Sequence, residues 1–110
     1  MALRRREKKA IELFKASLAE RLPAEKVGLL LFGSKARGDD RRGSDIDLMV
    51  LLKSDNLHAI DEVYRAVTDA SLTTSVYNIS LKPLSRRQFS TMKKDRTPFI
   101  CNVLKDAVSV

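Results

Sequence analysis

The chain has 110 residues, of which 44% are hydrophobic, and its formal net charge at pH 7 is +7. This length predicts one domain, residues 1–110, and excludes a separate substrate-binding domain within the chain. No apolar stretch approaches the roughly 20 residues of a membrane-spanning helix, and the basic N-terminus lacks the apolar segment of a signal peptide. We therefore expect a soluble, cytoplasmic protein with no membrane partner.

The charges are unevenly distributed along the chain. Residues 1–26 carry eight basic and four acidic side chains, residues 82–96 carry six basic and one acidic, and residues 45–75 carry six acidic and two basic. A positive net charge predicts a polyanionic partner, which is nucleotide phosphate, nucleic acid or an acidic protein. Nucleic acid is the secondary candidate, because a module that binds only nucleic acid needs no acidic centre. The run Arg4-Arg5-Arg6 either binds phosphate or is a solvated helix start.

The first 33 residues predict a helix followed by a buried strand. Residues 2–21 carry an apolar stripe at spacings of three and four, and Pro23 ends the helix. Residues 27–32 are nearly all apolar, which is typical of a strand covered on both faces, and Gly33 ends the run. The helical stripe consists of Ile11, Phe14, Leu18 and Leu22.

The middle of the chain predicts a loop, a strand and a helix. Residues 34–43 are polar and suit a loop with one helical turn near residues 35–37. Residues 46–52 suit a second strand, and residues 56–71 suit a helix capped by Ser54 or Asp55. The apolar face of that helix is expected to consist of Leu57, Ile60, Tyr64 and Val67.

The last third predicts a strand and two short helices. Residues 76–81 alternate between polar and apolar side chains, which indicates a strand with one polar face. Ser85 begins a capping-box pattern for a helix to about Lys94. Pro98 opens a helix to about Lys105, inside which Cys101 is expected in the core, and residues 107–110 add a terminal strand. The order of elements indicates an α+β fold.

The loop after the first strand has the composition of an anion site. Gly33 places no side chain in the way of a phosphate, and Ser34 offers a hydroxyl and a backbone N–H at the start of a turn. Lys35 and Arg37 add positive charge beside it. These four residues are therefore candidate nucleotide-binding residues.

Asp45 and Asp47 stand two residues apart at the start of the second strand, so they point to the same face of the sheet. Two such carboxylates repel each other unless a cation lies between them. Mg²⁺ takes one or two carboxylates together with phosphate oxygens of a nucleotide. The pair therefore predicts a catalytic Mg-NTP site, and a second metal is left open.

The combined pattern resembles a known signature. Gly33-Ser34, ten intervening residues and Asp45-Ile46-Asp47 are similar to the motif of the DNA polymerase β-like nucleotidyltransferase superfamily. The strings 32–38 and 44–48 look like those of minimal nucleotidyltransferases (MNT), the MntA-like antitoxins of HEPN/MNT toxin–antitoxin pairs. The resemblance is strong over residues 32–48 and looser over the rest of the chain.

The resemblance implies a short mixed sheet flanked by helices, the polymerase β-like fold. By position, it also implies that Gly33 and Ser34 bind NTP phosphates and that Asp45 and Asp47 hold Mg²⁺. Ser44 shapes the start of the strand and is a further candidate nucleotide-binding residue. The implied activity is transfer of a nucleoside monophosphate, AMP from Mg-ATP, to an acceptor hydroxyl. A tyrosine of a HEPN-domain toxin is the implied acceptor, which would make the chain an antitoxin.

The sequence departs from this family in one respect. Active members carry a third carboxylate on a later strand, where this chain has no acid and offers Asn78 and Ser80 as the only replacements. Asn is a weak ligand and cannot accept a proton, and a general base typically contributes about 10²–10⁴-fold. Three nearby acids and the only histidine are expected on the helix surface: Asp61, Glu62, Asp69 and His58.

Two main hypotheses about function and a weaker third therefore remain open at this point. Either the chain is a nucleotidyltransferase, or it is a catalytically degenerate module that binds nucleotide or a partner protein without turnover. The third, a nucleic-acid-binding protein, rests on the net charge of +7 alone and does not account for Asp45 and Asp47. The oligomeric state, including a homo-oligomer, is also left open.

Overall fold

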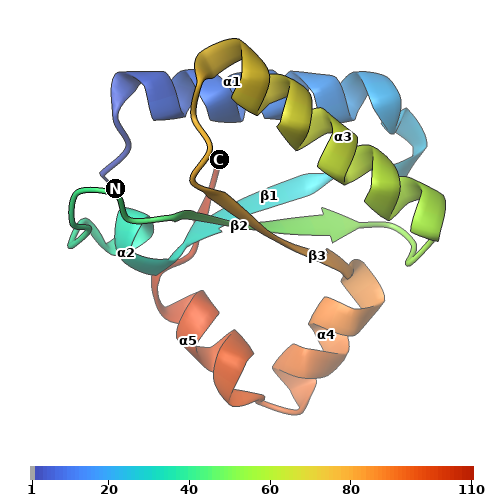
Figure 1. Ribbon diagram of the computed structural model, residues 1–110. Helices are drawn as coiled ribbons and strands as arrows, with labels where there is room; N and C mark the ends of the chain where they lie inside the picture. Colours follow the sequence, from blue (N-terminus) through green and yellow to red (C-terminus); the bar gives the residue numbers. More distant parts are fainter. Residues whose placement is uncertain (1) are drawn as a thin grey trace.

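Two long helices, α1 (Arg5–Arg21) and α3 (Leu57–Thr74), pack together over one face of a four-stranded sheet (Figure 1). Two short helices, α4 (Arg86–Lys94) and α5 (Pro98–Asp106), lie against the opposite face. This computed structural model describes residues 2–110. The arrangement confirms the predicted α+β class, with a sheet flanked by helices.

The sheet is mixed and has the strand order β3-β2-β1-β4. Strand β1 (Gly28–Phe32) pairs antiparallel with β2 (Ile46–Leu52) and with the short β4 (Val108–Ser109). Strand β3 (Ile79–Ser85) pairs parallel with β2. Two short helical turns, η1 (Pro23–Glu25) and α2 (Gly33–Arg37), precede and follow β1.

Successive side chains of the two central strands, β1 and β2, point alternately into two hydrophobic clusters, one on each face of the sheet. Leu31 and Leu48 are fully buried beneath α1 and α3, together with the predicted apolar stripe of α1. Met49 is fully buried on the opposite face, where it packs with residues of α4 and α5. Because side chains two apart on a strand share a face, Asp47 lies on the α4/α5 face with Met49.

Helix α3 exists as predicted, and the predicted face was right in part: Ile60 and Val67 are partly buried against the core, whereas Leu57 and Tyr64 are exposed. Its buried side chains are Ala59, Val63, Ala66 and Ala70, and Leu57 is 81% exposed. Small side chains allow α3 to approach α1 closely, so the alanines decide the buried face rather than the larger residues. The cap is also displaced: the Asn56 side chain, not Ser54 or Asp55, accepts the His58 N–H at 2.8 Å.

The third strand begins later and ends later than the alternation predicted. Val76 is buried in the core before the strand starts at Ile79, and the strand continues through Pro83 to Ser85. Strand β3 is at the edge of the sheet, where a proline is tolerated because one side of the strand needs no hydrogen bond. The capping box of α4 is confirmed, since the Ser85 hydroxyl and the Gln88 side chain each accept the other's backbone N–H.

Helix α5 forms as predicted, but Cys101 is exposed rather than in the core. Ile100 and Val103, three residues apart, occupy the buried face of the helix. Cys101 lies between them in sequence and therefore points to the exposed face.

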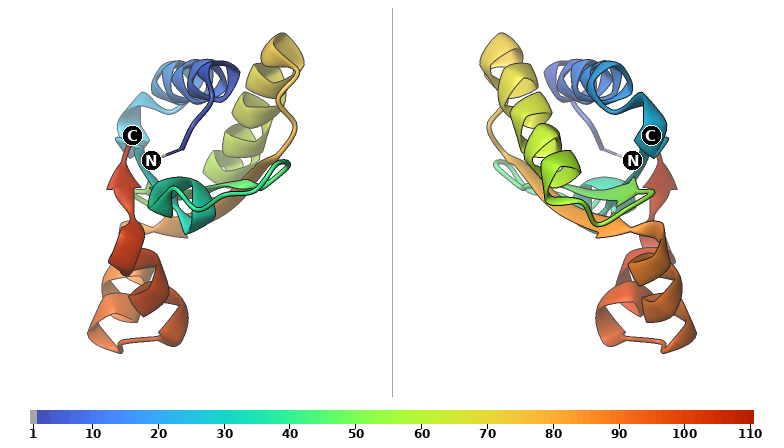
Figure 2. Two further views of the ribbon diagram at one scale, coloured as in Figure 1. Left: turned by 90° about the vertical axis from the view of Figure 1, so that its left-hand side faces the viewer. Right: turned by 90° about the vertical axis from the view of Figure 1, so that its right-hand side faces the viewer.

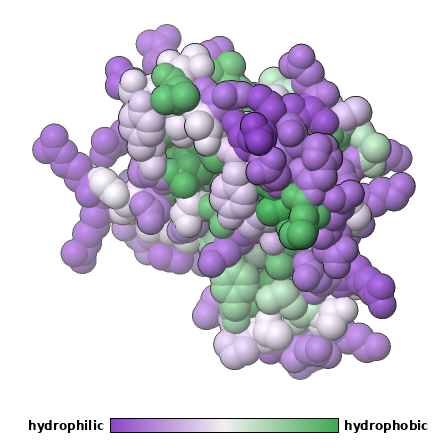
Figure 3. Space-filling view, turned by 45° about the vertical axis from the view of Figure 1, so that its right-hand side comes forward, coloured by the Kyte–Doolittle hydropathy of each residue, from purple (hydrophilic) through white to green (hydrophobic). Residues whose placement is uncertain are grey.

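The α4–α5 pair extends away from the rest of the molecule, and the last residues return to lie beside β1 (Figure 2). The surface is mainly hydrophilic, with hydrophobic side chains in a few patches, one of them where this pair meets the sheet (Figure 3). No helix among residues 2–110 has both the length and the apolar character needed to cross a membrane.

Candidate functional site

The predicted glycine turn and carboxylate pair meet at one edge of the sheet. In the antiparallel register of β1 and β2, Phe32 is opposite Asp47, so Gly33 follows directly beside that carboxylate. Gly33 has φ +74°, and a Cβ placed on it would overlap the Asp47 carboxyl group. Glycine suits this position because the backbone is in the left-handed region and any Cβ would have to displace the Asp47 carboxylate.

The chain enters α2 immediately at Gly33 and Ser34. The first N–H groups of a helical turn have no acceptor within the helix, so they are free to bind an oxygen of a ligand. The turn closes at its other end, where the Ser34 carbonyl accepts the N–H groups of Gly38 at 2.9 Å and Asp39 at 3.2 Å. This geometry holds the Ser34 amide and hydroxyl at the end of β1, next to the carboxylates.

The two carboxylates differ in their environment. Asp45 is exposed, whereas Asp47 is half-buried. Burial raises the pKa of Asp47, and the negative charge of Asp45 raises it further, while Arg37 and Lys82 oppose this rise. Both burial and the neighbouring carboxylate thus disfavour the charged form of Asp47 in the protein alone. A hard divalent cation with oxygen ligands would favour that charged form, so these residues fit Mg²⁺.

The two candidates for the missing third carboxylate are placed very differently. Ser80 is opposite Asp47 in the parallel register of β2 and β3, so both side chains share a face. Asn78 precedes the strand, and its amide donates to the Ser44 carbonyl at 2.8 Å and to Glu7 Oε2 at 3.3 Å. By register, Ser80 is therefore the candidate for the third position, whereas the Asn78 amide is held by Glu7 of α1 and by the loop before β2.

Neither of these side chains adds an acid to the pair. Among residues 2–110, no group of three or more His, Cys, Asp or Glu side chains could hold a metal ion. A cation at this edge would have to complete its coordination with nucleotide oxygens and water, as Mg²⁺ commonly does.

Lys35 does not face the site that its sequence position suggested. Its side chain is 2% exposed, and its ammonium lies 3.1 Å from both Glu7 and Asp40. Burial alone would lower the pKa of Lys35, but the hydrogen bonds and charges of these two carboxylates raise it. Lys35 therefore fastens α2 to α1 and to the following loop, and this geometry does not support a role as phosphate ligand.

Glu7 is the residue of this cluster that the sequence reasoning missed. It lies four residues before Ile11 and so continues the buried stripe of α1. An acid on an apolar stripe signals a buried partner, so the sequence held a signal for Glu7, although it did not identify Lys35 as the partner.

Arg37 and Ser44 flank the site. Arg37 pairs with Asp39 at 3.1 Å and with Asp106 of α5 at 3.7 Å, and it remains partly exposed beside Asp47. Ser44 closes the loop before β2, where its hydroxyl accepts the Arg41 N–H at 2.8 Å. This contact agrees with the expectation that Ser44 shapes the start of the strand.

A glycine turn beside a carboxylate pair, on a mixed sheet flanked by helices, defines a nucleotidyltransferase class of protein. The chain belongs to the nucleotidyltransferase domain family, whose family model matches residues 11–106. The family membership that the motif suggested is thereby confirmed. A search among curated proteins gave no match.

Two solved structures resemble this one. A Sulfolobus solfataricus protein assigned to the nucleotidyltransferases is 23% identical, with a TM-score of 0.53 over 97% of this chain and 86% of that chain. This likeness supports the fold alone. A chain of a toxin–antitoxin structure solved with AMP-PNP is 25% identical, with a TM-score of 0.51 over 93% of this chain and 69% of that chain.

Proposed function

We propose that this nucleotidyltransferase domain transfers AMP from Mg-ATP to an acceptor hydroxyl. The observation that carries the proposal is the placement of Asp47 directly beside the Gly33 turn, with the charge of Asp45 near enough to raise the pKa of Asp47. The turn offers donors for phosphate, and the carboxylates need a cation, so the two parts together suit a metal-bound triphosphate.

In this proposal Asp45 and Asp47 hold Mg²⁺, which when bound neutralises charge on the triphosphate. The Gly33–Ser34 turn binds phosphate oxygens, and Arg37 adds positive charge beside Asp47. The acceptor oxygen forms a bond to the α-phosphorus, and the bond from that phosphorus to the bridging oxygen of the β-phosphate breaks. Pyrophosphate leaves, and the proton of the acceptor hydroxyl passes to solvent or to a carboxylate.

The acceptor is proposed to be a tyrosine hydroxyl of a toxin partner with a HEPN domain, so that the domain acts as its antitoxin. Support comes from the toxin–antitoxin structure with AMP-PNP, which this chain resembles at 25% identity. The resemblance of residues 32–48 to minimal nucleotidyltransferases points the same way.

The test is transfer of label from [α-³²P]ATP to a HEPN-domain protein encoded beside this chain, with Mg²⁺ present. We expect label on the partner, located on a tyrosine by mass spectrometry, and none with the double variant Asp45→Ala/Asp47→Ala. The same reaction with labelled GTP, CTP and UTP tests the base preference. The enzymatic proposal fails if no label is transferred and the double variant still neutralises the toxin.

A second candidate function is a degenerate module that binds nucleotide or partner without turnover. Ser80 favours it, because a hydroxyl stands where a third carboxylate is expected and cannot act as a general base at neutral pH. Calorimetry separates the two: Mg-ATP binding that depends on Asp45 and Asp47 without release of pyrophosphate supports the binding module. Complete absence of Mg-ATP binding would rule out both the transfer reaction and a nucleotide-binding module.

A further inference from the structure

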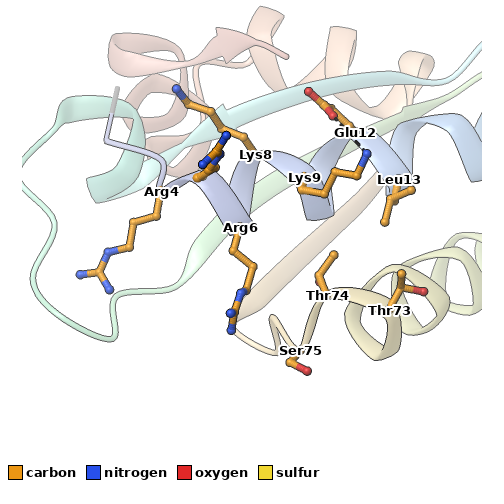
Figure 4. Close-up of a pocket in the computed structure, with 10 residues that line it drawn as sticks. Arg4, Arg6, Lys8, Lys9, Glu12, Leu13, Thr73, Thr74 and Ser75 are labelled. Carbon is orange, nitrogen blue, oxygen red and sulfur yellow. Dashed lines mark ion pairs between the residues drawn. The ribbon is translucent and has the colours of Figure 1, made fainter.

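A groove of about 1070 Å³ lies between the start of α1 and the end of α3 (Figure 4). Arg6 extends from α1 across the groove toward Ser75 at the end of α3. Five basic side chains of α1 and its cap line the groove: Arg4, Arg5, Arg6, Lys8 and Lys9. This is a concentration of positive charge on one wall of a concave surface.

These cations are not neutralised by the protein itself. Lys9 lies 4.0 Å from Glu12, and both side chains are more than 60% exposed, so this pair is weak. The other four form no ion pair within residues 2–110. Uncompensated like charges at this density repel one another, and a bound polyanion removes that repulsion.

The groove continues toward Asp45, past Glu7 and Asn78. A second hollow of about 690 Å³ shares Arg4, Arg6 and Ser75 with it, so the two form one path. The second hollow reaches Asp45 and is also lined by Tyr77, whose side chain is 69% exposed. An exposed aromatic ring thus follows the row of cations along the same path.

We propose that this path binds a single-stranded nucleic acid, with its phosphates on the start of α1 and a base stacked on Tyr77. Cations that follow a backbone together with an exposed ring are how proteins hold single strands. Recognition of an acidic protein requires only the cations, whereas a single strand uses cations and an exposed ring together, and we therefore choose the nucleic acid as the occupant. The inference does not depend on the proposed AMP transfer.

The spacing of the cations suits this ligand. Helical rise of about 1.5 Å per residue places Arg4 and Lys9 about 7.5 Å apart along the direction of α1, which spans about two intervals, and so about three phosphates, of a stacked strand at about 3.4 Å per interval. The opposite wall offers few free donors, because the Thr73 and Thr74 hydroxyls donate to helix carbonyls at 2.9 and 2.8 Å. Recognition is therefore independent of base sequence.

The experiment measures fluorescence anisotropy of a labelled 12-nucleotide oligo(U) with the full chain, without nucleotide or Mg²⁺. The triple variant Arg4→Gln/Arg6→Gln/Lys9→Gln is expected to weaken binding at least tenfold. It should also lower the slope of log K against log salt by about two, since each single-strand phosphate contact contributes about 0.7. Binding in the absence of ATP keeps this result separate from the success or failure of AMP transfer.

The control for bulk charge is Arg87→Gln/Lys94→Gln/Lys105→Gln, which removes the same three charges from exposed sites on α4 and α5. It is expected to change affinity less than threefold. Tyr77→Ala is expected to weaken binding about fivefold or more, whereas Tyr77→Phe keeps the ring and the affinity. Circular dichroism confirms that each variant is folded.

Four results would overturn the proposal. Equal losses in the two triple variants would assign binding to net charge rather than to the groove. Displacement of the oligonucleotide by poly-L-glutamate at equal charge concentration would favour an acidic protein as the occupant. Unchanged affinity of Tyr77→Ala for the oligonucleotide would rule out base stacking on Tyr77. Tighter binding of a 12-base-pair duplex than of the single strand would rule out a single strand as the preferred ligand.

Discussion

Gly33 and Asp47 are in direct contact: the Asp47 carboxylate fills the space that a Cβ of Gly33 would occupy. The two residues are 14 positions apart in sequence, and the antiparallel pairing of β1 with β2 brings them together. The glycine is thus needed twice, for its φ of +74° and for the room it leaves to a carboxylate.

Gly33→Ala is therefore expected to disturb the carboxylate site as well as the backbone. Alanine at positive φ costs about 1–2 kcal/mol, and the clash must in addition move Asp47. We expect Mg-ATP affinity to fall at least tenfold, measured by isothermal titration calorimetry.

Gly43→Ala is the matched control, because Gly43 has φ +83° and nothing lies within 4 Å of its added Cβ. It should lose similar stability from backbone strain but keep Mg-ATP affinity within about threefold, since no carboxylate moves. Equal affinities of the two variants for Mg-ATP would contradict the role given to the Gly33–Asp47 contact.

Asp47→Asn should stabilise the metal-free protein. The pKa of Asp47 is raised in the folded state by burial and by Asp45, so the folded state binds more protons than the unfolded state between the two pKa values. Stability is then lost as the pH rises through the folded pKa, and the loss persists at pH 7. Asp47→Asn removes this loss of stability. The free energy of unfolding is expected to rise by no more than about 1 kcal/mol, since the side chain is partly exposed and solvent screens its charge.

Thermal unfolding in EDTA between pH 3 and pH 7 checks this sign. Mg²⁺ should raise the Tm of the wild type and not that of Asp47→Asn, since only binding to the folded state shifts the equilibrium. Asp61→Asn is the control of opposite sign, because Arg65 lowers the pKa of Asp61 on the surface. A destabilised Asp47→Asn in EDTA would show that the carboxylate already has sufficient counter-charge.

Ser80→Asp should restore the third carboxylate. Ser80 is opposite Asp47 on the same face, so an acid there would join the pair at the sheet edge. If the domain is limited by the missing base, the rate of AMP transfer rises by about 10²-fold or more with Mg²⁺ present. Release of pyrophosphate measures the rate.

Asn78→Asp tests the position rather than the charge. The Asn78 amide donates to Glu7 and to the Ser44 carbonyl, and an acid would lose both bonds and repel Glu7. We expect this variant to lower the Tm and leave the rate unimproved. A rate gain in Asn78→Asp with none in Ser80→Asp would reverse the assignment of the third position.

The contrast between these two residues shows what could be predicted from the sequence. Gly33, Asp45 and Asp47 are predicted as candidates because Gly33 follows one apolar run directly and the two acids stand at the start of the next, and the ends of paired antiparallel strands lie together. Asn78 and Ser80 are two residues apart, so the alternation of polar and apolar residues predicts the same face for both, yet only Ser80 lies inside the strand. Where a strand starts depends on the strand with which it pairs, and the local sequence pattern carries no information about that neighbouring strand.

The remaining differences have the same origin. The Lys35–Glu7 contact joins residues 28 apart in sequence, and only the packing of α1 on the sheet brings them together. The buried face of α3 depends on how closely α1 approaches, which favours alanines over the larger apolar residues. Element type is decided locally, whereas the direction of a charged side chain is decided by what packs against it.

Lys35→Met should strongly destabilise the fold. It leaves the Glu7 and Asp40 carboxylates without their shared cation, and breaking a buried pair in this way typically costs about 3–5 kcal/mol. Urea unfolding at pH 7 measures the loss. Lys15→Met is the control, since Lys15 is exposed on α1 and should change stability by less than about 0.5 kcal/mol.

The pH dependence of this cluster gives a second, independent readout. In the wild type, hydrogen bonds lower the pKa of Glu7 against the effect of burial, and Lys35 lowers the pKa of Asp40. Their contribution is present above the unfolded pKa values of 4.5 and 3.8 and is lost as the pH falls through the folded ones. In Lys35→Met the sign reverses, because protonation relieves the unpaired carboxylates, so the deficit against wild type should shrink as the pH falls from 7 toward 4. If Lys35→Met instead keeps its stability but loses affinity for Mg-ATP, Lys35 binds phosphate, as its position after Gly33-Ser34 first suggested.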